Sequence, residues 1–443
     1  MPFLNLIDQL LTRGLRVTMA VTTNNLHLLQ PLLSAYPSSL QTLPLDHHEN
    51  TDPSRNWLFA NARATYDLHS PVLLKFFQSH PSPPVAIISD FFLGWTNQLA
   101  SQLGVPRIVF SPSPSCALSV YYSLWRELPH KDDPNDDDKD FVVSFPNVPN
   151  SPAYSVDQLP DYYIAYKEGN ADSEFYRDCE LGNVASWGVL LNSFTELERV
   201  YIDHLKEVHG GDRVWAVGPV HRGSQVVNSG EKSSESTLEL MTWLDECSTS
   251  SVVFVSFGSW VTLTDEQVSE LAEALEQSGV HFVWRVNGVH KGNNTGGECE
   301  VMPDGFRERV ADRGFVTKGW VPQVEILSHP AVGSFLTHCG WSSVVEAVTE
   351  GVMMLTWPMS ADQFINAKLL VEELGVAVRL REGTQTIPES GEMARILAES
   401  LDPNMPERAR VKRLSEAALE AVKDGSSKRD LDELVKQLGQ LKK

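Results

Sequence analysis

The feature of this chain that most restricts its fold is the alternation of short apolar runs with segments whose apolar residues recur at helical spacing. Such alternation is typical of βαβ units, in which helices join neighbouring parallel strands. Strands are expected at residues 16–22, 85–89, 107–110, 189–192, 214–217, 252–256, 281–286, 315–318, 334–337 and 353–357. The pattern therefore predicts an α/β protein built on parallel sheets.

Local signals place some helix ends. Thr264 and Gln267 form a capping box that opens a helix, and Gly279 ends it. Another helix is expected from Phe92 to Leu103, with Gly104 as its stop. These boundaries support the alternation of strands and helices.

A polar segment rich in Ser, Gly and charge divides the strands into two sets. This composition is typical of a linker. The expected parts are an N-terminal domain of residues 1–221, a linker of 222–236, a C-terminal domain of 237–425 and a helix of 426–443 that packs back on the N-terminal domain. Two Rossmann-like domains joined in this way imply a cleft between them, where such sheets bind ligands.

Charge excludes some classes of partner. The chain has 36 Lys and Arg against 58 Asp and Glu, which gives a net charge of −22. Nucleic acids and anionic membranes bind basic surfaces, so neither is expected as a partner. No apolar run approaches the roughly 18 residues of a membrane span. The protein is expected to be a monomer.

The cysteines indicate a reducing compartment. They are widely spaced, odd in number and in no metal-ligand pattern: Cys116, Cys179, Cys247, Cys299 and Cys339. With no signal peptide at the N-terminus, a cytoplasmic location is expected. The six aspartates between Lys131 and Asp140 are expected to form a solvated loop rather than a metal site, and the sequon at Asn293 should stay unmodified.

One segment of the C-terminal half carries residues suited to bind an anion. A strand is expected to end at Thr337 and a helix to begin at Ser342, which makes His338-Cys339-Gly340 a strand-to-helix turn. Free backbone N–H groups and the positive end of the helix dipole would meet a diphosphate there. His338 could add a charge-assisted hydrogen bond, Ser342 and Ser343 could add hydroxyl donors, and Gly340 permits close approach of the backbone.

The same segment matches a known family signature over 44 residues. The matching positions are Trp320-Val321-Pro322-Gln323, Ile326 to His329, Ala331 to Phe335, Thr337 to Ser343, Glu346, Gly351, Trp357-Pro358 and Asp362-Gln363. The segment resembles the signature box of plant family-1 UDP-glycosyltransferases in length, order and nearly every fixed position. The resemblance covers nearly the whole chain and is strongest to flavonol-type glucosyltransferases, as in residues 80–95. It implies a GT-B fold, with two Rossmann-like domains facing across a cleft.

The resemblance also implies roles for donor-site residues. Trp320 would stack on uracil, with the backbone of Val321 and Gln323 completing the base site. Glu346 would accept hydrogen bonds from the ribose, although it could instead form a capping box with Ser343. Trp320 alone would usually be a core residue.

Other donor-site residues follow from the same match. Asp362 and Gln363 would bind sugar hydroxyls, and glutamine rather than histidine at the end of the box favours glucose; in isolation the two residues resemble a surface pair. Trp341 is also a position of the family signature and is expected to belong to the UDP-sugar site. Ser259, in the loop after the strand at 252–256, would contact the phosphate or sugar, or could be a simple turn residue.

The chain departs from the family pattern at two places. Ser342 stands where the family usually has asparagine, so it keeps a hydroxyl donor and loses an amide. The family begins with a strand and a loop carrying a general-base histidine, whereas this chain begins in the following helix, near Pro2 to Leu11. Asp90 matches the aspartate that orients that histidine, whose counterpart is absent here. Met1 is therefore expected to be internal to a longer protein, and the 443-residue form to express poorly and turn over no acceptor.

The expected reaction is inverting transfer of glucose from UDP-glucose to a hydroxyl of a small phenolic or flavonoid acceptor. UDP-glucose is a co-substrate, and no cofactor or metal is expected because helix-end donors and His338 stabilise the diphosphate. The alternative is a UDP-sugar-binding protein that lacks the base. A dinucleotide-dependent oxidoreductase is disfavoured because no Gly-x-Gly-x-x-Gly follows a strand, and a purely structural protein is the least favoured class.

Overall fold

The computed structural model describes residues 2–48, 56–129, 141–220, 235–287, 302–387 and 389–441. The expectations for the acidic loop, the sequon, Cys299 and nearly all of the linker fall outside these ranges. The chain divides into two compact units. Unit 1 comprises Met1–Glu231 and Glu420–Lys443, and unit 2 comprises Lys232–Leu419.

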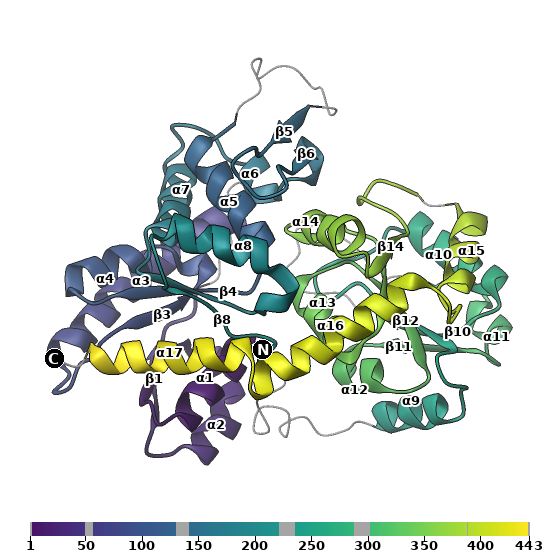
Figure 1. Cartoon of the computed structure of the whole chain (residues 1–443), viewed down its shortest axis with the longest axis horizontal. Helices are drawn as coiled ribbons and strands as arrows, with labels where there is room; N and C mark the ends of the chain where they lie inside the picture. Colours follow the sequence, from purple (N-terminus) through teal and green to yellow (C-terminus); the bar gives the residue numbers. More distant parts are fainter. Residues whose placement is uncertain are drawn as a thin grey trace. The chain divides into compact units, whose positions relative to one another are not determined.

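Unit 2 is built on a parallel sheet of six strands in the order β11-β10-β9-β12-β13-β14 (Figure 1). The strands are β9 (Val252–Ser256), β10 (His281–Val286), β11 (Gly314–Lys318), β12 (Val332–Thr337), β13 (Met353–Thr356) and β14 (Ala377–Arg379). Its helices are α9 (Glu235–Asp245), α10 (Asp265–Ser278), α11 (Phe306–Arg309), α12 (Gln323–Ser328), α13 (Trp341–Glu350), α14 (Gln363–Lys368), α15 (Ser390–Glu399) and most of α16 (Pro406–Lys423), with a π-helical segment at Leu369–Glu373. Successive strands run outward in opposite directions from β9 and β12, so the switch point of this doubly wound sheet lies between those two strands.

Buried apolar strands explain why this sheet forms. Every residue of β9, β12 and β13 is buried, as expected for parallel strands covered on both faces by helices. Phe254 of β9 and Phe335 of β12 stack with ring centroids 5.0 Å apart. The Thr264–Gln267 capping box forms at the start of α10, and Gly279 ends that helix with a φ of 66°. Both local predictions are therefore confirmed.

Unit 1 contains a second parallel sheet, of four strands in the order β3-β4-β7-β8. Its strands are β3 (Ile87–Asp90), β4 (Arg107–Ser111), β7 (Gly188–Leu191) and β8 (Val214–Ala216). β1 (Val17–Thr22) and β2 (Leu40–Leu45) form a separate parallel pair, and β5 (Val142–Ser144) and β6 (Ala153–Ser155) an antiparallel one. In the described part of the chain β1 pairs with β2 alone and β3 with β4 alone; the expectation of a missing first strand stays a prediction.

Helices surround these strands in unit 1. They are α1 (Pro2–Thr12), α2 (Gln30–Ala35), α3 (Trp57–Ser79), α4 (Thr96–Leu103), α5 (Ser115–Glu127), α6 (Asp161–Ile164), α7 (Ala171–Val184), α8 (Thr195–Val208) and α17 (Ser426–Gln440). The 3-10 segments in the described part of unit 1 include Thr23–Leu29, Phe91–Leu93 and Val156–Gln158. The prediction that a helix begins at Phe92 is wrong, because α4 begins only at Thr96. The Asp90 carboxylate accepts the Phe92 N–H and caps a 3-10 turn before α4.

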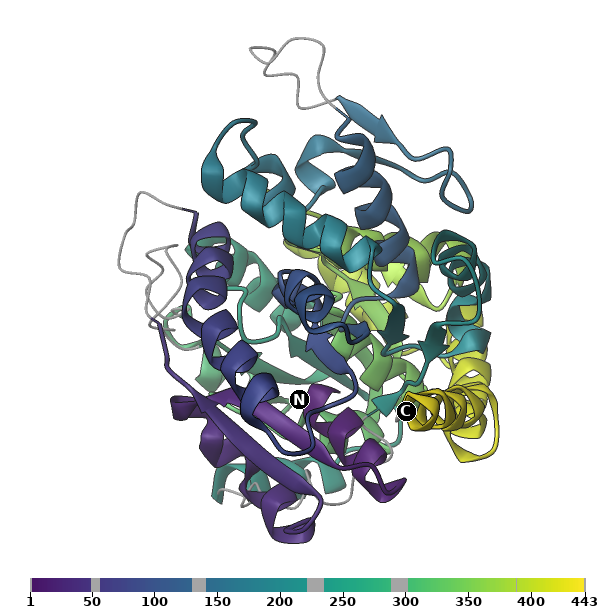
Figure 2. The same ribbon diagram turned by 90° about the vertical axis from the view of Figure 1, so that its left-hand side faces the viewer.

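Helix α1 packs against the four-stranded sheet and against the β1–β2 pair, and Figure 2 shows this N-terminal part of the chain in purple. Leu6 and Leu10 belong to a buried cluster with Phe110 of β4, whereas Ile7 and Leu11 belong to another with Leu40 of β2. The apolar face of α17 joins the first cluster through buried leucines such as Leu434. The last helix of the sequence therefore packs in the same core as the first, and Figure 1 shows it beside β8.

The α/β class with two Rossmann-like units is confirmed. Strands β2, β5, β6 and β14 were not predicted; three of them have only three residues each, and β2 contains Pro44. Within the described ranges no helix is long and apolar enough to cross a membrane. Within the described ranges Cys116, Cys179, Cys247 and Cys339 form no disulfide.

Candidate functional site

Two loops follow neighbouring strands at the switch point of the unit 2 sheet. Gly258 and Ser259 follow β9, and His338 to Gly340 follow β12. Because the strands are parallel, both loops lie at the carboxyl edge, where open α/β sheets bind ligands. The predicted strand-to-helix turn is confirmed, with β12 ending at Thr337 and α13 beginning at Trp341.

The backbone of this turn is held in an uncommon conformation. Cys339 has a φ of 65°, in the left-handed region. Its N–H donates to Thr337 Oγ1 at 3.2 Å, and its carbonyl oxygen accepts the Nδ2–H of buried Asn366 at 2.9 Å. Gly340 is the N-cap of α13 and supplies no side chain. The first-turn amides of α13 are therefore presented at an uncapped, positive helix end, which suits an anion.

His338 is enclosed by two glycines. A Cβ at Gly258 would lie 2.6 Å from the His338 ring, and a Cβ at Gly340 would lie 2.5 Å from its Nε2 atom. The residue is 9% exposed, and its Nδ1 atom is buried without a hydrogen-bond partner in the described structure. A buried polar atom normally has a partner, so this nitrogen is a candidate ligand contact.

The surroundings of His338 set its protonation state. Burial, and secondly the charge of Arg285, lower the pKa of His338 to about 4. The imidazole is therefore neutral at pH 7, so in a hydrogen bond from His338 to a diphosphate the charge would come from the diphosphate, and the expected charge-assisted bond stays a prediction. A neutral ring still offers one N–H donor.

Three predicted residues meet through one side chain. Gln323 Nε2 donates to Ser343 Oγ at 2.9 Å and to Glu346 Oε2 at 2.7 Å. Burial raises the pKa of Glu346 to about 7, although the bond from Gln323 opposes that rise. Because α13 starts at Trp341, Ser343 lies inside the helix and the capping-box alternative for Glu346 is wrong.

Trp320 and Val321 lie between β11 and α12. Trp320 is 55% exposed and follows Gly319, whose φ is 90°. A core role for Trp320 is therefore wrong, and its ring is open to a planar ligand. Val321 is buried beside it.

Gln363 is not the surface residue that its sequence context allowed. It is 7% exposed, and its Oε1 atom accepts the N–H groups of Met359 at 2.9 Å and Ser360 at 3.1 Å. With the carbonyl committed to this loop, the amide group is oriented and its N–H bonds can serve only as donors. Asp362 precedes it as the N-cap of α14.

The remaining predicted donor residues differ in burial. Ser259 and Ser342 are exposed, whereas Trp341 is buried at the start of α13. Trp341 therefore anchors the helix start to the core, while the two serines present hydroxyls to solvent.

Two residues at the end of β10 were missed by the sequence analysis. Arg285 Nε donates to Gly319 O at 2.8 Å, and its Nη1 donates to Gly258 O at 2.6 Å. Asn287 Nδ2 donates to Gly258 O at 2.8 Å and also to Val261 O. A charged residue near the end of a mostly apolar strand, Arg285 in β10, was the sequence signal that could have identified them.

In unit 1, Asp90 is the last residue of β3. Its carboxylate accepts the Phe92 N–H at 3.0 Å. Burial raises the pKa of Asp90, while that bond and the nearby Arg107 act in the opposite direction. Among the described residues no histidine is bonded to Asp90, and the role of Asp90 beside a catalytic histidine stays a prediction.

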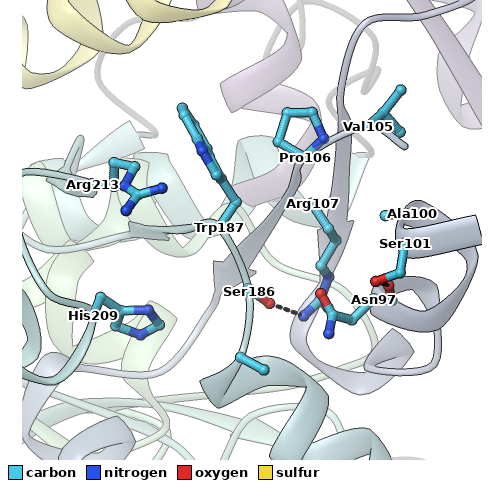
Figure 3. A pocket seen from close by; sticks show the side chains of 11 residues that line it. Asn97, Ala100, Ser101, Val105, Pro106, Arg107, Ser186, Trp187, His209 and Arg213 are labelled. Carbon is cyan, nitrogen blue, oxygen red and sulfur yellow. Dashed lines mark hydrogen bonds between the residues drawn. The ribbon is translucent and has the colours of Figure 1, made fainter. Parts of the chain in front are cut away.

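A cavity of about 410 Å³ lies at the opposite, amino edge of the unit 1 sheet (Figure 3). Arg107 begins β4, and Trp187 and Arg213 directly precede β7 and β8. The Arg213 guanidinium lies 5.2 Å from the Trp187 ring centroid. Helices α4, α7 and α8 end at this cavity, so its cations stabilise helix C-termini. Asp90 does not line the cavity, but Arg107 Nη2 donates to the Asp90 carbonyl oxygen at 3.3 Å.

Groups of three or more His, Cys, Asp or Glu side chains able to hold a metal do not occur among the described residues.

Comparison with known proteins decides the family. The family described as UDP-glucoronosyl and UDP-glucosyl transferase matches residues 228–399. The chain is 46% identical to the flavonol 3-O-glucosyltransferase UGT89B1 of Arabidopsis thaliana, over 97% of this chain and 92% of that protein. The chain belongs to the plant UDP-glycosyltransferases.

Other members of the family agree. UDP-glycosyltransferase 89B2 of Stevia rebaudiana is 47% identical, over 98% of this chain and 94% of that protein. The crystal structure of Arabidopsis thaliana UGT89C1 complexed with UDP-L-rhamnose superposes with a TM-score of 0.77 at 34% identity, covering 99% of this chain and 95% of that one. The GT-B fold type is thereby confirmed, and the chain is a hexosyltransferase with a UDP-sugar as donor.

Proposed function

We propose that this UDP-glycosyltransferase transfers glucose from UDP-glucose, with inversion, to a hydroxyl of a flavonoid-type phenol. The observation that carries the proposal is the turn at His338, where an uncapped helix end and an unpartnered buried nitrogen adjoin the linked residues Gln323, Ser343 and Glu346. The naming of UGT89B1 as a flavonol 3-O-glucosyltransferase supports the acceptor class.

Each part of the donor has a proposed set of contacts. Uracil stacks on exposed Trp320, beside the backbone of Val321 and Gln323. The ribose hydroxyls donate to Glu346 in its ionised form. Amides at the start of α13, the His338 ring and the hydroxyls of Ser259, Ser342 and Ser343 bind the diphosphate.

The contacts to the sugar determine which UDP-sugar the protein uses as donor. The Gln363 carbonyl is held by the backbone of its own loop, so its amide donates to a sugar oxygen. The Asp362 carboxylate accepts a hydrogen bond from a neighbouring hydroxyl of the sugar. Glutamine rather than histidine at position 363 is the feature on which the proposed preference for glucose rests.

The chemistry follows from these contacts. The acceptor oxygen attacks the anomeric carbon from the face opposite UDP, and the bond from that carbon to the phosphate oxygen breaks. UDP leaves with the electron pair, and preorganised N–H donors stabilise its developing charge. The phenolic proton passes to a base. Asp90, at the carboxyl edge of the unit 1 sheet, is proposed to orient that base.

A second candidate function is UDP-sugar binding without transfer. The observation that favours it is the Asp90 carboxylate, whose described hydrogen-bond partner is a backbone N–H rather than a histidine. Calorimetry with UDP and turnover assays separate the two functions. Binding without turnover supports the second one.

The test of the first function compares donors. Initial rates with UDP-glucose, UDP-galactose and UDP-L-rhamnose are measured against a panel of flavonols, and NMR gives the configuration of the product. UDP-glucose should give the highest kcat/KM and a β-glucoside. Replacement Gln363→His should narrow the preference for glucose over galactose. Equal rates for the two hexoses, or a product that retains the donor configuration, would overturn the assignment.

A further inference from the structure

Arg285 occupies a central place among the strands that carry the donor site. It is the next-to-last residue of β10, which lies between β11 and β9 in the sheet. The loops after β11 and β9 therefore lie on either side of it. From this position its guanidinium bonds to the Gly319 carbonyl at 2.8 Å and to the Gly258 carbonyl at 2.6 Å.

These two carbonyls belong to loops with different parts of the donor site. Gly319 directly precedes Trp320, the proposed uracil platform. Gly258 directly precedes Ser259 and lies against the His338 ring, where even a methyl group would clash. One side chain thus sets the spacing between the base contact and the diphosphate contacts.

The charge of Arg285 also reaches the turn after β12. After burial, it is the second cause of the lowered pKa of His338. A positive charge that disfavours a second positive charge on His338 also favours a diphosphate beside it. Arg285 therefore affects loops after three strands, β9, β11 and β12.

We propose that Arg285 is a positioning residue for the UDP-sugar, which fixes the separation of the uracil and diphosphate contacts. This inference rests on the proposed donor site. The side chain acts through the Gly258 and Gly319 loops. Its two bonds leave from different nitrogen atoms of one planar group, a geometry that the single ammonium of lysine cannot reproduce.

Replacement of Arg285 affects its two carbonyl acceptors differently. Asn287 also donates to Gly258 O, so that carbonyl keeps a partner in a variant. Gly319 O is the acceptor that loses its bond. The loop carrying Trp320 should therefore shift more than the loop carrying Ser259.

The test compares Arg285→Gln and Arg285→Lys with Arg309→Gln in the full chain. The control removes a surface ion pair, because Arg309 bonds to Glu276 at 2.7 Å on the same unit. UDP affinity is measured by calorimetry, and KM and kcat are measured for UDP-glucose and for the acceptor. Arg285→Gln should weaken UDP binding and raise the KM for UDP-glucose about 10- to 30-fold, as expected for two lost hydrogen bonds. Arg285→Lys should weaken UDP binding only about fivefold, because lysine keeps the positive charge. The control Arg309→Gln should bind UDP as the wild type does.

Two readouts distinguish positioning from general stability. The KM for the acceptor should stay within about twofold of the wild-type value, and the NMR-measured pKa of His338 should rise in Arg285→Gln but not in Arg309→Gln. Unchanged UDP affinity in Arg285→Gln would overturn the inference. So would equal losses for both substrates together with a lowered melting temperature.

Failure of the proposed function is separable from failure of the inference. UDP binding that depends on Arg285, in a protein that transfers no sugar, supports the inference and contradicts the transferase proposal. A wild-type chain that binds no UDP contradicts both.

Discussion

At the residue scale, the Trp320 side chain is exposed rather than packed in the core, so its ring is open to stacking by uracil. Trp320→Ala should weaken UDP binding by roughly 1–3 kcal/mol, the usual value of base stacking on an aromatic side chain. Trp57→Ala is the control, because Trp57 is 52% exposed against 55% for Trp320 and lies on α3 of unit 1. Calorimetry should show a loss for the first variant alone; equal affinities would exclude Trp320 from the base site.

Glu346 gives a pH dependence with a defined sign. Its pKa is raised from 4.5 to about 7, so between these values the folded protein holds a proton that the unfolded chain releases. Stability should therefore fall as pH rises through this window, by on the order of 3 kcal/mol for this group. Buried Glu180 of unit 1, whose pKa is also raised to about 7, acts in the same direction.

Replacing Glu346 tests that dependence. Glu346→Gln should reduce the fall in unfolding free energy between about pH 5 and pH 8, and should leave the part that Glu180 contributes. Glu416→Gln, at an exposed position of α16, should leave the dependence unchanged. Urea unfolding at a series of pH values measures both. A Glu346→Gln profile parallel to that of the wild type would show that burial does not control this group.

At the element scale, two glycines with nearly the same backbone angle give a matched comparison. Gly258 has a φ of 67° and a Cβ position 2.6 Å from His338, whereas Gly279 has a φ of 66° and no atom within 4 Å of its Cβ position. Alanine should cost roughly 1–2 kcal/mol of stability at either site, because both lie in the left-handed region. Only Gly258→Ala should also displace His338.

UDP binding separates the two variants. Gly258→Ala should weaken it about tenfold or more, which is the effect of a lost or displaced contact of about 1.4 kcal/mol. Gly279→Ala should bind UDP as the wild type does. Equal UDP affinities in calorimetry would mean that the packing of Gly258 against His338 has no role in donor binding.

At the scale of the whole molecule, the chain returns to unit 1 through its last helix. Leu434 of α17 is fully buried in a cluster with Leu6 of α1 and Trp215 of β8. Leu434→Ala should destabilise the protein by about 2–5 kcal/mol, the range for a buried leucine truncated to alanine. Leu28→Ala, at a position that is 45% exposed, should cost much less.

Hydrogen exchange locates that effect. Leu434→Ala should speed exchange in α1 and β8 and leave α13 unchanged, because α13 belongs to the other unit. Faster exchange in α13 alone would contradict the placement of α17 in the unit 1 core.

The sequence by itself determined the fold class and the strand-to-helix turn at which we propose that the donor binds. Strands β9 and β10 match their predicted ranges residue for residue, because each is an apolar, β-rich run bounded by turn residues. The turn at His338 was predicted for the same reason, since the end of a strand and the start of a helix are both local signals. The family signature added the residues that line this turn.

Only the tertiary structure decided the properties that depend on neighbours distant in sequence. A strand as short as β14 is defined by its pairing with β13, and local propensity cannot predict such pairing. The neutral state of His338 and the raised pKa of Glu346 come from burial that no short segment reveals. Arg285 joins the loops of β9 and β11 because the sheet order places β10 between them. Spacing along the chain fixes which residues follow each strand, whereas the packing of strands and helices fixes which side chains meet and how strongly they hold a proton.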